Sequence, residues 1–98
     1  MLRSVPSSLV ELIEVRPVLG DSFRLVEIFV NPKYIVSVSD HQPAKNLTES
    51  MSKIGLSRNA QFSTVILKES KGSREFQVVG DARTIYLKLN NKRGLLKG

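Results

Sequence analysis

Short apolar runs with a period of two, separated by turn or loop segments, are the feature of this chain that most limits its fold. The clearest run covers residues 23–30, where Val26, Ile28 and Val30 share one side of an extended strand. Asn31-Pro32 ends this run, because proline lacks a backbone donor and keeps the residue before it extended. Runs of this kind are typical of β-strands. The pattern therefore predicts a mainly β protein.

Four further segments show a similar alternation: residues 9–15, 34–39, 62–68 and 74–79. The first of them fits either a strand or a helix, and its β-branched side chains together with the nearby Pro17 favour a strand. Gly and Asp in residues 18–22 predict a turn before the clearest strand. Residues 69–73 predict a hairpin turn between the last two strands.

The connection over residues 40–61 is too long for a simple loop inside a small domain. Three of its apolar residues recur at helical spacing: Leu47, Met51 and Ile54. Asn46 fits an N-cap position, and Gly55 fits the left-handed position that ends many helices. We therefore expect a short helix over residues 46–56.

The segment after Gly80 is compatible with a strand or a helix. Residues 82–89 alternate in part, but they also contain apolar residues at i, i+3, i+4 and i+7. Asp81 directly before this segment is a suitable N-cap, which favours a helix. Residues 90–94 are expected to end it.

Together these elements predict a small antiparallel curved sheet, or a partly open barrel, of about five strands with a C-terminal helix. We expect residues 1–8 to be a flexible leader, residues 9–92 a single small β-rich domain, and residues 93–98 a basic tail. The expected core consists of Leu25, Ile28, Val30, Ile35, Val65, Leu67, Phe76, Val78, Ile85 and Leu89.

Residue types that most catalytic and metal sites need are scarce. The 98 residues contain no cysteine and one histidine, which excludes disulfides, thiolate zinc sites and thiol nucleophiles. Ser39, Asp40 and His41 are adjacent, so their side chains point apart and do not form a hydrolase triad. We expect no enzymatic activity, cofactor, metal site or small-molecule substrate.

No apolar run reaches the roughly 20 residues that a membrane span needs, so we expect no membrane partner. The first eight residues lack the apolar segment of a secretory signal. The expected compartment is the cytoplasm of a bacterium or of a virus-infected host cell.

Positive charge is concentrated in the second half of the chain. Residues 1–49 carry a net charge of −1 and residues 50–98 a net charge of +7, which together give the +6 of the whole chain. A basic half attracts polyanions such as nucleic acid, or an acidic protein surface. A net charge of this size is also ordinary for a small soluble domain.

Two groups of basic residues carry this charge: Lys68, Lys71 and Arg74 around one hairpin turn, and Arg83, Lys88, Lys92 and Arg93 along the last helix and its exit. If that helix returns across the final strands, the two groups would merge into one cationic surface. Tyr34, Tyr86 or Phe62, where exposed, would offer a face for base stacking. The first hypothesis is therefore a non-enzymatic module that contacts nucleic acid without strong sequence preference.

The second hypothesis is a protein-interaction adaptor or a homo-oligomer. It would use open sheet edges and the helix over residues 46–56, with Leu47, Met51 and Ile54 as contact residues. Exposure of these three side chains would favour a protein partner. Their burial would leave the basic residues as the leading candidate.

Residues 28–38 contain an apolar strand, an Asn-Pro turn and an Ile-x-x-Val strand, and residues 64–89 contain a hairpin and a short helix. This order resembles the small flagellar FlbD-like proteins of swarming motility and similar small phage and bacterial proteins. The resemblance covers residues 23–90, while the insertion over residues 40–61 and the segment before Phe23 depart from it. It implies a small β fold with no catalytic residues.

Overall fold

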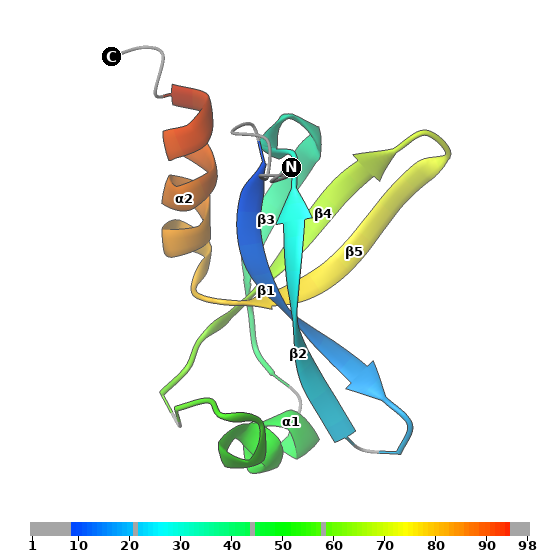
Figure 1. Ribbon diagram of the computed structural model, residues 1–98, viewed down its shortest axis with the longest axis vertical. Coiled ribbons are helices and arrows are strands. Elements are labelled where there is room, and N and C mark those ends of the chain that lie inside the picture. The colour runs from blue at the N-terminus through cyan, green and yellow to red at the C-terminus, as the bar shows by residue number, and fades with distance from the viewer. Residues whose placement is uncertain (1–8, 21, 44, 58, 95–98) are drawn as a thin grey trace, which may run out of the picture.

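The computed structural model describes residues 9–20, 22–43, 45–57 and 59–94. Its elements follow the order β1 (Val10–Val18), β2 (Ser22–Val30), η1 (Pro32–Tyr34), β3 (Ile35–His41), α1 (Lys45–Ser50), η2 (Met51–Ile54), β4 (Phe62–Glu69), β5 (Gly72–Val79) and α2 (Ala82–Gly94). The five strands form one antiparallel sheet in the order β2-β1-β5-β4-β3 (Figure 1). The sheet does not close, because β2 and β3 remain its two edges. The predicted mainly β fold with a C-terminal helix is confirmed.

The ambiguous N-terminal segment is a strand and extends past Pro17. β1 pairs with β2 from Val10↔Val30 to Val18↔Ser22, whereas its register with β5 is limited to Glu14↔Val78. At Pro17, β1 is therefore paired on one side alone. A strand tolerates proline at such a position, because the missing N–H leaves no gap in a second ladder.

Two hydrophobic clusters lie on opposite faces of the sheet, since successive residues of a strand point to opposite sides. Along β1, Leu12 shares a face with Val10, while Val15 lies on the other face. The α2 cluster consists of Val10, Leu12, Val30, Val65, Phe76, Val78, Ile85 and Leu89. The α1 cluster consists of Val15, Leu47, Met51 and Phe62.

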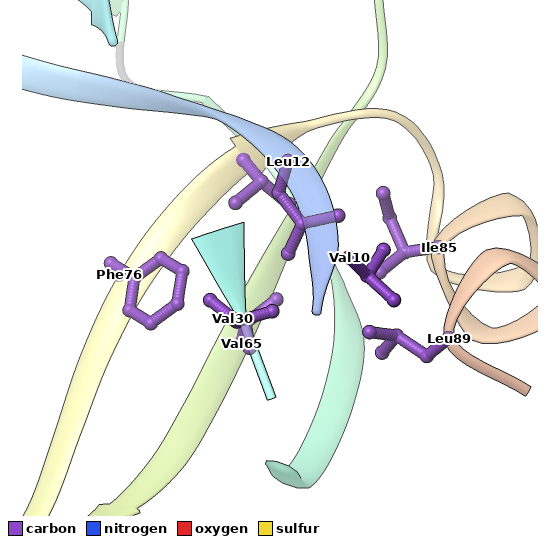
Figure 2. Packing of buried hydrophobic residues seen from close by; sticks show 8 residues of the cluster. Val10, Leu12, Val30, Val65, Phe76, Ile85 and Leu89 are labelled. Atoms are coloured by element: carbon purple, nitrogen blue, oxygen red, sulfur yellow. The ribbon is translucent and has the colours of Figure 1, made fainter. Parts of the chain in front are cut away.

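The α2 cluster holds the C-terminal helix against the sheet. Figure 2 shows Val10 of β1 beside Ile85 and Leu89 of α2. In Figure 1, α2 lies along one side of the sheet, and α1 lies at the end reached by the β1–β2 hairpin. Each face of the sheet is thus covered by a helical segment over part of its area.

Every residue of the expected core is buried or partly buried, but the expectation is incomplete on both faces of the sheet. Six expected residues are buried: Val30, Val65, Phe76, Val78, Ile85 and Leu89. Ile28, Ile35 and Leu67 are partly buried against the α2 cluster, and Leu25 against the α1 cluster. The buried hydrophobic residues missing from the expectation are Val10, Leu12, Val15, Leu47, Met51 and Phe62.

The helical segment in the long connection is present as α1 followed by η2. Gly55 ends it with φ of +83°, and the Leu56 N–H donates to the Met51 carbonyl at 2.9 Å, as expected for this type of helix ending. The N-cap prediction for Asn46 is wrong, because α1 already begins at Lys45. The capping position therefore precedes Lys45 and falls outside the described residues.

The segment after Gly80 is a helix, as Asp81 indicated, but it continues through residues 90–94, where it was expected to end. Asparagine lowers helix propensity by less than about 1 kcal/mol per residue, and the buried Leu89 holds the preceding turn on the sheet. The first two residues of the expected tail thus belong to α2. The leader, residues 1–8, and residues 95–98 lie outside the described part of the chain.

Candidate functional site

The apolar stripe of the long connection points into the protein. Leu47 and Met51 are buried in the α1 cluster, and Ile54 is partly buried against it. These side chains attach the segment over residues 45–54 to the sheet instead of facing solvent. Their burial leaves the basic residues as the leading candidate for the functional surface.

The basic residues lie on two separate surfaces. Lys68, Lys71 and Arg74 are exposed at the β4–β5 hairpin, whose tip lies on the opposite side of Figure 1 from α2. Arg83 and Lys88 are exposed on α2. The helix does not return across the hairpin, so the two groups do not form a single cationic surface. The side chains of Lys92 and Arg93 fall outside the described part of the structure.

The hairpin surface is partly neutralised. The Arg74 Nη1 atom lies 3.8 Å from the Glu69 Oε2 atom, and its guanidinium group lies 5.7 Å from the centroid of the Phe76 ring. These contacts hold Arg74 against its own hairpin. Lys68 and Lys71 are then the cations that this surface offers to a ligand.

The exposed residues of α2 fall on two flanks. Arg83, Tyr86 and Asn90 recur at i, i+3 and i+7 and therefore share one flank. Lys88 lies two residues after Tyr86, which places it on the other flank. Residues 82–94 contain four basic residues and no acidic residue.

A groove separates the first of these flanks from β3. It encloses about 160 Å³ and is lined by Ile35, Val36, Ser37, Val38, Tyr86, Leu89 and Asn90. A β-bulge between Ile35 and Ser37 leaves Val36 without a partner in the ladder and exposes its side chain. We define the β3–α2 surface as this groove together with four exposed residues at its ends and rim: Lys33, Tyr34, Arg83 and Tyr86.

The direction of the groove follows from a hydrogen bond between distant parts of the chain. The Ala82 N–H at the start of α2 donates to Asp40 Oδ1, near the end of β3, at 2.8 Å. Farther along α2, Leu89 and Asn90 line the groove together with Ile35 and Val36 at the start of β3, so β3 and α2 run in opposite directions. Arg83, one residue after Ala82, lies beyond one end of the groove and lines the neighbouring cleft, and η1 with Lys33 and Tyr34 precedes β3 at the other end.

Asp81 fixes the beginning of α2. Its carboxylate accepts from the Thr84 hydroxyl at 2.6 Å and from the Thr84 N–H at 3.3 Å. These hydrogen bonds, the hydroxyl bond first, hold the pKa of Asp81 below its usual value. The two carboxylates at this helix end are thus engaged with the helix itself, and no salt bridge to Arg83 is present among the described residues.

The lowered pKa of Asp81 gives a pH-dependent contribution to stability. Because the folded pKa lies below the unfolded value of about 3.9, this contribution is present above pH 4 and is lost as the pH falls through the folded pKa. We expect Asp81→Asn, which keeps an N-cap acceptor but does not titrate, to lose less stability than the wild type between pH 6 and pH 2. Urea midpoints at several pH values test this, and equal losses in both proteins would contradict it.

Ser39, Asp40 and His41 do not form a catalytic group. Asp40 faces α2, whereas His41 lies on the other face of β3 with its Nδ1 atom 3.2 Å from the Thr64 hydroxyl oxygen. A cleft of about 730 Å³ lies beside them, between the end of β3, residues 59–62 and the start of α2.

Within the described residues, no group of three or more histidine and acidic side chains is placed to hold a metal ion. Nor does any described helix combine the length and apolar character that crossing a membrane requires.

Of the residues in the β3–α2 surface, Arg83, Tyr34 and Tyr86 were candidates from the sequence, whereas Lys33, Val36 and Asn90 were not. Asn31-Pro32 marked the turn that presents Lys33, and the helical spacing from Tyr86 to Asn90 was visible. No pattern in the sequence indicated that α2 packs beside β3. Phe62, the third candidate for stacking, is buried.

Comparisons of this chain with protein-family models, with curated proteins and with solved structures give no match. The resemblance to the FlbD-like proteins therefore stays a prediction.

Proposed function

We propose that this chain is a small non-enzymatic module that binds nucleic acid through the β3–α2 surface. The observation that carries the proposal is the pairing of Arg83 with Tyr86, exposed neighbours on a helix that has no acidic residue. A cation beside an exposed aromatic ring is the combination by which proteins bind nucleic-acid backbones and bases.

The charges of the surface support this proposal. Lys33 and Arg83 stand at opposite ends of the groove, and neither has a carboxylate within 4.0 Å among the described residues. Cations without such partners are available to neutralise phosphates and release the counterions condensed around them. Contacts of this kind position a nucleic acid without reading its sequence, which is why we propose little sequence preference.

The alternative role as a protein adaptor has less support. Its contact residues Leu47 and Met51 are buried, so they present no docking surface in this conformation. The β3 edge is open, but the bulge at Val36 interrupts the regular ladder that a second strand would need.

Salt dependence of binding tests the proposed function. The change is Lys33→Gln with Arg83→Gln, measured by fluorescence anisotropy with a labelled oligo-dT. We expect weaker binding and a slope of log K against log salt that is smaller by about 1.4, because each phosphate neutralised on a single strand contributes about 0.7.

The matched control is Lys68→Gln with Lys71→Gln, which lowers the net charge by the same two units at the hairpin. This control is expected to retain most of the wild-type slope. An equal or larger reduction of the salt slope in the control would show that the nucleic acid binds at the hairpin instead of the β3–α2 surface. Absence of binding by the wild type to both oligo-dT and a duplex at low salt would contradict the proposed function altogether.

A further inference from the structure

We infer that the β3–α2 groove takes single-stranded rather than duplex nucleic acid, with one unpaired base stacked on Tyr86. This inference rests on the proposed function and specifies its ligand. Three features of the groove carry it: two exposed tyrosines, polar groups of mixed character along the wall, and an edge strand unsuited to pairing with another strand.

The tyrosines offer faces that only unpaired bases can use. Tyr86 is 55% exposed and Tyr34 is 50% exposed, and both belong to the β3–α2 surface. The bases of a duplex are already stacked on one another, whereas the bases of a single strand stack on aromatic side chains. An extended strand laid along β3 would pass from Arg83 over Tyr86 towards Tyr34 and Lys33.

The groove wall next to Tyr86 has hydrogen-bonding groups of both kinds. Ser37 contributes a hydroxyl and Asn90 an amide, and each can donate and accept. The outer side of β3 also has backbone groups without a neighbouring strand, since β3 is an edge of the sheet. Such a mixed set can pair with the edge of any base, so the groove selects unpaired bases rather than a sequence.

The edge itself argues against another polypeptide strand as the occupant. The bulge between Ile35 and Ser37 breaks the spacing of the backbone groups that strand addition requires. Lys33 in η1, two residues before β3, adds a charge that disfavours pairing with a further copy of the same edge. A phosphate chain has the opposite charge and needs no regular ladder.

The test compares oligo-dT of about 15 nucleotides, the upper end of common site sizes, with a duplex of equal length. For Tyr86→Ala we expect about a 5- to 150-fold loss of affinity for oligo-dT, from the roughly 1–3 kcal/mol that a stacked base contributes. Tyr86→Phe keeps the ring and should stay close to the wild type. Leu87→Ala is the matched control, because it shortens an exposed neighbour outside the groove. The duplex is expected to bind more weakly than oligo-dT and to be insensitive to Tyr86→Ala.

The outcomes separate this inference from the proposed function. If Tyr86→Ala leaves oligo-dT binding unchanged while Lys33→Gln with Arg83→Gln weakens it, base stacking is wrong and the nucleic-acid proposal stands. If the duplex binds as tightly as oligo-dT, the single-strand preference is wrong. If the wild type binds neither and sediments as a dimer that Tyr86→Ala dissociates, both proposals fail and the groove is an interface between copies of this chain.

Discussion

Phe62→Ala is expected to lower the free energy of unfolding by about 3–5 kcal/mol, the usual cost of removing a buried phenylalanine ring. Phe62 begins β4 and is 2% exposed, and it packs in the α1 cluster with Leu47 and Met51. Removing the ring would leave a cavity between the sheet and the segment over residues 45–54. A loss of this size is a large part of the roughly 5–15 kcal/mol that typically stabilises a folded domain.

The control for this prediction is Phe29→Ala, which removes the same ring from a position that is 45% exposed on β2. Its expected cost is about 1 kcal/mol or less. Urea unfolding followed by circular dichroism measures both. Similar losses in the two variants would show that the α1 cluster is not a second core.

Leu89→Ala is expected to lower the free energy of unfolding by about 2–5 kcal/mol. Leu89 is 4% exposed and, with Ile85, anchors α2 in the α2 cluster. It also lines the groove beside Tyr86. We therefore expect this variant to weaken oligo-dT binding as well, because a loosened helix no longer holds Arg83 and Tyr86 beside β3.

Leu87→Ala is the control that tests whether the stability lost in Leu89→Ala results from removing a buried side chain. Leu87 is two residues away on the same helix and is 47% exposed, so its truncation should change stability by no more than about 0.5 kcal/mol. Thermal and urea unfolding of the two variants give the comparison. Equal destabilisation would mean that α2 is not docked through Leu89.

Alternation of apolar residues was sufficient to predict five strands, and Asp81 was sufficient to choose a helix for the last element. The second core was harder to predict. In residues 9–15, apolar side chains occur on both sides, which fits a strand buried on both faces as well as a helix. Phe62 and Val15 belong to the α1 cluster, and their burial depends on where the connection over residues 40–61 packs.

The candidate site illustrates the same limit. Basic residues near the C-terminus were visible in the sequence, but Arg83 and Lys88 lie on different flanks of α2, and the hairpin cations lie elsewhere. The hydrogen bond that sets α2 beside β3 joins Asp40 to Ala82, residues 42 positions apart. No local pattern specifies such a contact, so the groove could not be predicted from spacing alone.

The apolar stripe of Leu47, Met51 and Ile54 shows a further ambiguity. Its helical spacing was interpreted correctly, but an amphipathic stripe has the same spacing whether it docks on its own sheet or on a partner. The exposed fraction of these side chains distinguishes the two cases. In this chain the stripe covers its own sheet.

The most direct test of the account is a nuclear magnetic resonance titration of ¹⁵N-labelled protein with oligo-dT, following each backbone amide. We predict that the largest chemical-shift changes occur in β3 and α2, around Val36, Arg83, Tyr86 and Asn90. Changes confined to the β4–β5 hairpin, or no changes at low salt, would contradict it.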